Sequence, residues 1–67
     1  MIDIEIGRRI RAARKRFGLT QRQLAAATGI HERTLRSYEA GATEPHGVFL
    51  RALQEALDLN PSTKEVV

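Results

Sequence analysis

The sequence contains no cysteine among its 67 residues. This absence excludes disulfide bonds and thiolate metal sites. The two histidines, His31 and His46, lie fifteen positions apart with no cluster of other ligands beside them, so we expect no metal and no cofactor. Apolar runs are short, far below the roughly 18 residues that a membrane span needs. We therefore expect no membrane partner.

Several classes of protein are disfavoured by size and by the amino-terminal residues. A chain this short buries only about 60% of its unfolded surface, so a deep substrate cavity is not expected. Ser37 and His31 lack an orienting acid in a cleft, which argues against an enzyme. Residues 1–6 are too acidic and too short in apolar run for a signal peptide, so we expect a cytoplasmic location.

Positive charge is unevenly distributed along the chain. Residues 8–36 contain nine Lys or Arg and a single acid, Glu32, whereas residues 45–67 contain two basic and three acidic residues. Such a local excess is the electrostatic footprint expected of a surface that binds phosphates. A solvated helix face or a helix on a membrane surface would have the same composition, so charge alone does not decide between them.

Hydrophobic periodicity predicts two helices in the first half of the chain. The first ends at Gly18 and carries one apolar stripe, formed by Ile6, Ile10, Ala13 and Phe17. Thr20 and Gln23 have the spacing of a capping box, in which each side chain accepts a hydrogen bond from the other residue's backbone amide. The second helix therefore follows Thr20 and ends at Gly29, because glycine readily adopts the left-handed conformation of a sharp turn.

Two more helices are expected before residue 60. The third has an apolar inner side and ends at Gly41, and a loop over residues 42–47 separates it from the fourth. Their inner-side residues are Ile30, Thr34, Leu35 and Tyr38 in the third helix and Phe49, Ala52, Leu53, Ala56 and Leu57 in the fourth. No period-two segment indicates a strand. The prediction is an all-α compact bundle in residues 1–59, followed by a tail, residues 60–67.

The segment TQRQLAAATGIHERTLRSYEAG, residues 20–41, resembles the helix-turn-helix of the phage repressor and Cro family, an XRE-like DNA-binding domain. The resemblance extends from about residue 7 to residue 59. It implies a lambda-repressor-like fold of four short helices, or five, although little sequence remains for a fifth after Pro61. The matching core positions are Leu24, Ala25, Gly29, Ile30, Leu35 and Tyr38. An ordinary four-helix bundle without a nucleic-acid role is the alternative.

The resemblance also implies how the third helix would meet DNA. In the family, the second helix of the motif enters the major groove with its first residues facing base edges. The corresponding base-reading positions are His31, Glu32, Arg33, Arg36 and Ser37. Arg33 is the principal candidate because a guanidinium matches the O6 and N7 acceptors of guanine. Glu32 has two equal interpretations, a contact to cytosine N4 or a favourable position in the first helical turn, and Arg36 is placed for bases or phosphate.

Other positions carry over as phosphate contacts and as a structural pair. Thr20, Gln21 and Arg22 lie at the start of the second helix, where backbone amides and the helix dipole favour anions. Gln21 matches the family's phosphate clamp, and solvent exposure is the alternative for both Gln21 and Arg22. Arg14 and Glu39 match an arginine and glutamate that bond in related repressors. They are expected to form either a weak surface pair or, as we favour, a buried bidentate pair.

These features predict a sequence-specific binder of double-stranded DNA, a Cro-like or phage or plasmid repressor. One such domain reads few base pairs, so we expect a homodimer on a pseudo-palindromic operator, formed either in solution or only on DNA, without a small-molecule effector. The alternative from another class is a protein-binding module, such as an antitoxin or an adaptor to polymerase or a regulator, that uses the same helical surface.

Overall fold

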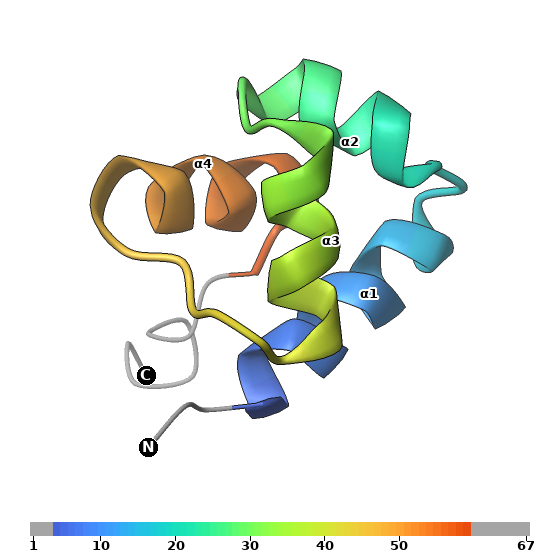
Figure 1. The fold of residues 1–67 in the computed structure, drawn as a ribbon. Helices are drawn as coiled ribbons and strands as arrows, with labels where there is room; N and C mark the ends of the chain where they lie inside the picture. Colours follow the sequence, from blue (N-terminus) through green and yellow to red (C-terminus); the bar gives the residue numbers. More distant parts are fainter. Residues whose placement is uncertain (1–3, 60–67) are drawn as a thin grey trace, which may run out of the picture.

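The computed structural model describes residues 4–59, and within them the chain forms four α-helices (Figure 1). The helices are α1 (Ile4–Arg16), α2 (Gln21–Thr28), α3 (Glu32–Ala40) and α4 (Gly47–Leu57). Strands are absent from the described residues, which confirms the predicted all-α class. None of these helices is long and apolar enough to cross a membrane. The predicted tail, residues 60–67, lies outside the described residues.

Helix α2 begins and ends where the local sequence predicts. Thr20 caps α2 in a complete capping box, with Thr20 Oγ1 accepting from the Gln23 amide at 3.0 Å and Gln23 Oε1 accepting from the Thr20 amide at 2.9 Å. At the other end, Gly29 has a φ of 78°, and its amide donates to the Ala25 carbonyl oxygen. The tight turn that follows places the start of α3 directly beside the end of α2.

The core lies where the four helices meet. α3 packs against α1 and α2, and α4 packs against the same two helices, so α1 and α2 link the others. In Figure 1, α3 runs down the middle of the view, with α2 above it, α4 to its left and α1 behind its lower part. The buried apolar residues are Ile10, Ala13, Leu24, Ala25, Ile30, Leu35, Tyr38, Leu53 and Leu57. One side of α3 is therefore held in the core while its other side remains available.

Two aromatic residues predicted to lie on inner faces are exposed instead. Phe17 is 52% exposed because α1 ends at Arg16 and the chain turns before the apolar stripe reaches it. Phe49 is 42% exposed because it lies in the first turn of α4, whose buried residues, Leu53 and Leu57, come later. Thr34 is only half-buried. The helical period predicts which face of a helix a residue lies on, but not whether a neighbouring helix covers that position. It therefore overestimates burial at helix ends.

Gly7 has a structural role that the sequence reading did not assign. It is buried in α1, and a β-carbon there would lie 2.2 Å from the Tyr38 carbonyl oxygen and 3.3 Å from that of Glu39. Only a residue without a side chain lets α1 approach the last turn of α3 this closely. A glycine inside a helical pattern was the available signal, because glycine is unfavourable in a helix interior unless packing requires it.

Candidate nucleic-acid interface

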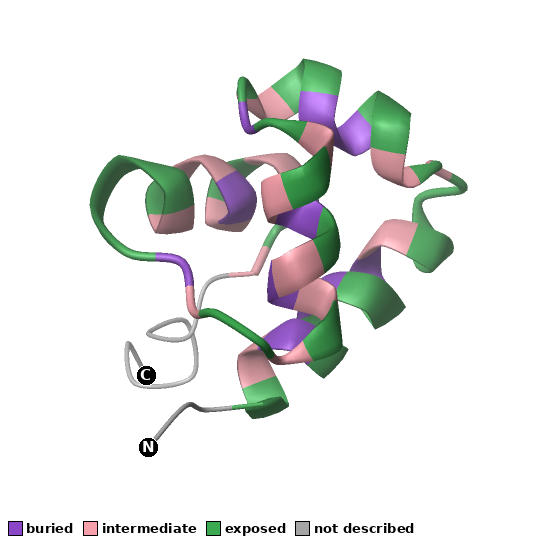
Figure 2. Cartoon of the chain, in the orientation of Figure 1, coloured by how far each residue is buried: buried purple, intermediate pink, exposed green. Residues whose placement is uncertain are grey.

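The outward side of α3 carries the polar residues predicted to read bases. Buried and exposed bands alternate along this helix (Figure 2). Arg33 and Arg36 are exposed, whereas Leu35 and Tyr38 are buried in the core. Burial raises the pKa of Tyr38 above its usual 10.0, since the phenolate would be poorly solvated there. The two sides of α3 thus differ sharply in what they contact.

Glu32 and Ser37, also predicted for this surface, are half-buried. His31 is exposed and is the residue that caps α3. Its Nδ1 accepts a hydrogen bond from the Arg33 amide at 3.3 Å, so this nitrogen is occupied by the cap. Nε2 is then the ring nitrogen that a base could meet.

Arg36 lies between two hydrogen-bond acceptors from different helices. Its Nη2 donates to Glu32 Oε2 at 3.2 Å, one turn earlier on α3. Its Nε donates to Gln21 Oε1 at 3.4 Å, from the first residue of α2. The side chains of Arg36 and Glu32 are 61% and 39% exposed, so this ion pair is a surface feature. The two proposed DNA-contacting helices are therefore joined by a polar side-chain contact.

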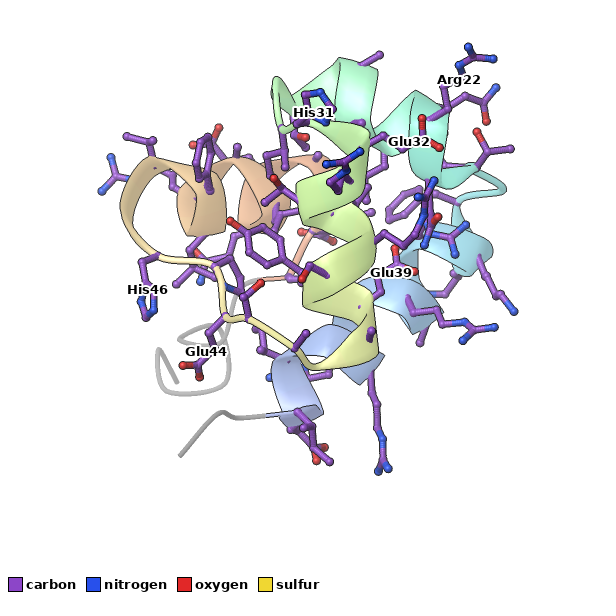
Figure 3. The ribbon with its side chains drawn as sticks, in the orientation of Figure 1. Arg22, His31, Glu32, Glu39, Glu44 and His46 are labelled. Carbon is purple, nitrogen blue, oxygen red and sulfur yellow. The ribbon has the colours of Figure 1, made fainter. Side chains whose placement is uncertain are left out.

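Gln21 extends this contact toward the interior, so that hydrogen-bonded polar side chains form a continuous series, called here the polar chain. Its Nε2 donates to Glu39 Oε1 at 3.2 Å, so the carboxamide connects Arg36 to Glu39. Glu39 extends from the last part of α3 (Figure 3). Because one end of the carboxamide donates and the other accepts, these two contacts define which way it faces.

The Arg14–Glu39 pair is the inner end of the polar chain. Of the two arrangements expected for it, a weak surface pair or a buried bidentate pair, the structure has the buried one. Arg14 Nε donates to Glu39 Oε2 at 2.7 Å, and Nη2 donates to Oε1 at 3.0 Å. Their side chains are only 11% and 4% exposed. Nη1 also donates to the Leu19 carbonyl oxygen at 2.7 Å. The pair fixes α3 against α1 and the turn that precedes α2.

The start of α2 contains the three positions assigned to phosphate. Arg22 is exposed, and Figure 3 shows it in the upper part of the view, where His31 and Glu32 also lie, whereas His46 and Glu44 lie lower and to the left. Thr20 Oγ1 already accepts a hydrogen bond in the helix cap, and the Gln21 carboxamide already forms hydrogen bonds in the polar chain. Among the described residues, no three His, Cys, Asp or Glu side chains lie close enough to hold a metal ion.

Sequence reasoning did not find the contacts that Gln21 makes with Arg36 and Glu39. Gln21 and Arg36 are 15 positions apart, and Gln21 and Glu39 are 18 apart. No local periodicity links such residues, because their approach depends on how α2 and α3 cross.

Comparison with known proteins identifies the family of this fold. A helix-turn-helix family model matches residues 10–63. The chain belongs to the phage repressor and Cro-type helix-turn-helix family. The motif consists of α2, the turn at Gly29, and α3.

Individual relatives match most of this chain. It is 40% identical over 60 residues to the HTH-type transcriptional regulator DicA of Escherichia coli, covering 90% of this chain and 44% of that protein. It is 38% identical over 56 residues to repressor protein C2 of Salmonella phage P22, covering 84% of this chain and 26% of that protein. It is also 31% identical over 65 residues to multiprotein-bridging factor 1 of Candida albicans, covering 97% of this chain and 43% of that protein. The chain thus spans less than half the length of these relatives.

Proposed function

We propose that this chain binds double-stranded DNA sequence-specifically and regulates transcription, most simply as a Cro-like or phage or plasmid repressor. The main observation behind this proposal is that the two faces of α3 differ: its inner face is buried in the core, while Arg33 and Arg36 are exposed. A rigidly held helix with an outward polar face is what direct readout in the major groove requires. The relatives named as a transcriptional regulator and a repressor support the same function.

In this proposal the helix-turn-helix residues divide into two groups. Arg33 reads a guanine, assisted by the other exposed or half-buried polar positions of α3 and its cap, His31, Glu32, Arg36 and Ser37. Arg22 and Gln21 contact phosphate at the start of α2, together with the Thr20 region. Phosphate contacts set the position of α3 on the duplex, and base contacts supply the discrimination.

We further propose that two copies act together on a pseudo-palindromic operator, without a small-molecule effector. Half-sites one helical turn apart have centres separated by about 34 Å, which a two-fold dimer matches. Residues 1–59 are the DNA-binding unit in this proposal.

The test is selection of binding sites from a random duplex library, followed by fluorescence anisotropy at several salt concentrations. We expect a pseudo-palindromic consensus, and we expect Arg33→Ala to lose about 10-fold or more in affinity for it. Arg51→Ala, which removes an exposed arginine from α4, is the matched control and should retain binding. Equal affinity for every duplex, or equal losses in both variants, would contradict sequence-specific readout by α3.

A protein-bridging role is the second candidate, favoured by the similarity to multiprotein-bridging factor 1. The salt series separates the two functions. Binding that neutralises several phosphates weakens steeply with salt, with a log-log slope of about −0.9 per contact. A protein interface formed by the same surface would lack this dependence on phosphate contacts.

A further inference from the structure

The exposed end of the polar chain contains an acid in a surface that is otherwise basic. Glu32 lies one turn before Arg36 on α3 and accepts a hydrogen bond from its Nη2 at 3.2 Å. Arg36 is simultaneously directed at Gln21 by the 3.4 Å contact from Nε. The guanidinium is therefore held by two acceptors, one of which also neutralises its charge.

We propose that Glu32 is a positioning residue that determines specificity through Arg36, an inference that rests on the proposed DNA-binding function. The carboxylate holds the guanidinium against Gln21 and reduces its attraction to phosphates in general. Arg36 engages DNA only where the bound sequence places acceptors against the guanidinium N–H groups that neither Glu32 nor Gln21 uses. Glu32 thereby lowers binding to unrelated DNA more than binding to the operator.

The geometry of the pair suits this role. A guanidinium has five N–H donors, and Glu32 and Gln21 each accept from one of them, so a well-placed bidentate acceptor on a base edge can bind the remaining donors without displacing either partner. A phosphate that Arg36 reaches only by turning away from Glu32 is bound less favourably, because this movement leaves the Glu32 carboxylate unpaired beside a polyanion. The preference arises because the Glu32–Arg36 pair stays intact on the operator and is broken on unrelated DNA.

The rest of the polar chain keeps the second acceptor in place. Glu39 Oε1 accepts from Gln21 Nε2 at 3.2 Å, and Arg14 holds Glu39 through bonds of 2.7 and 3.0 Å. The Arg14 and Glu39 side chains are almost fully buried, so Gln21 Oε1 is oriented from the core. Arg36 is consequently positioned relative to α2 as well as to its own helix.

The test compares Glu32→Gln with Glu55→Gln, which removes the same charge from an exposed position on α4. Dissociation constants are measured by anisotropy for the selected operator and for an unrelated duplex, over a fourfold range of salt. The ratio of the two constants should fall about threefold or more in Glu32→Gln relative to the control. The salt slope for the unrelated duplex should steepen by up to about 0.9, the value of one phosphate contact.

An Arg36→Gln background determines whether Glu32 acts through Arg36. There, Glu32→Gln should change the specificity ratio no more than Glu55→Gln does. An undiminished effect in that background would overturn the proposal, since Glu32 would then act on DNA directly. Equal behaviour of Glu32→Gln and Glu55→Gln in the natural background would overturn it as well.

Failure of the proposed function gives a different result. In that case the unsubstituted chain itself selects no sequence, and no specificity ratio above one exists to be changed. If the unsubstituted chain discriminates while Glu32→Gln leaves the ratio unchanged, the DNA-binding function stands and the role of Glu32 is refuted. Thermal unfolding of each variant, measured in parallel, identifies any loss of binding that arises from loss of the fold.

Discussion

Arg14 of α1 holds Glu39 of α3 through two hydrogen bonds, from Nε to Oε2 at 2.7 Å and from Nη2 to Oε1 at 3.0 Å. With side chains 11% and 4% exposed, the pair lies at the junction of α1, α2 and α3. Its charges are mutually compensated, so each residue depends on the other to remain buried.

Removing one partner should therefore be costly. We expect Glu39→Gln to lower the free energy of unfolding by about 3 kcal/mol or more, because Arg14 would remain buried without its counter-charge. The exposed Glu32–Arg36 pair provides the comparison, and Glu32→Gln should cost at most about 1 kcal/mol. Urea unfolding followed by circular dichroism measures both. Similar losses in the two variants would show that burial does not set the contribution of the Arg14–Glu39 pair.

Gly7→Ala should destabilise the protein, although alanine is usually better than glycine in a helix by about 1 kcal/mol. The added methyl group would lie 2.2 Å from the Tyr38 carbonyl oxygen, which forces α1 away from α3. Ala12→Gly, at an exposed position of the same helix, tests the intrinsic preference alone and should cost about 1 kcal/mol. A higher thermal midpoint for Gly7→Ala than for the unsubstituted chain would rule out the close contact.

Alkaline titration should report the burial of Tyr38, the only tyrosine in the chain. Because burial raises its pKa above 10.0, the folded state retains the phenol proton where the unfolded state loses it. This contribution to stability is present below about pH 10 and is lost as pH rises through the folded pKa. Phenolate absorbance should show a higher midpoint in the native protein than in denaturant. Tyr38→Phe should reduce the decline of stability with pH in this range, and coincident midpoints would contradict the assignment.

Arg22→Gln should weaken binding to all duplexes alike, because a phosphate contact carries no base information. The log-log salt slope should become shallower by about 0.9, as expected for one lost contact. Arg51→Gln removes the same charge from an exposed position on α4 and should leave the slope nearly unchanged. Loss of affinity confined to the operator would instead place Arg22 among the residues that read bases.

The sequence correctly predicted several features whose cause is local. The capping box of Thr20 and Gln23, and the left-handed turns at Gly29 and Gly41, depend on residues within a few positions of one another. Buried positions near the middle of helices, such as Ile10 and Leu35, were also predictable from the period. Phe17 and Phe49 were not, because each lies at a helix end, where burial depends on the neighbouring helices.

By itself, the sequence determined the helices, their caps and the apolar side of α3, since local hydrogen bonding and a 3.6-residue period decide these features. Only the tertiary structure decided which polar groups meet. It brought Gln21 between Arg36 and Glu39, and it brought Gly7 against the backbone of Tyr38. Such contacts join residues far apart in the chain, and their geometry depends on how the helices cross.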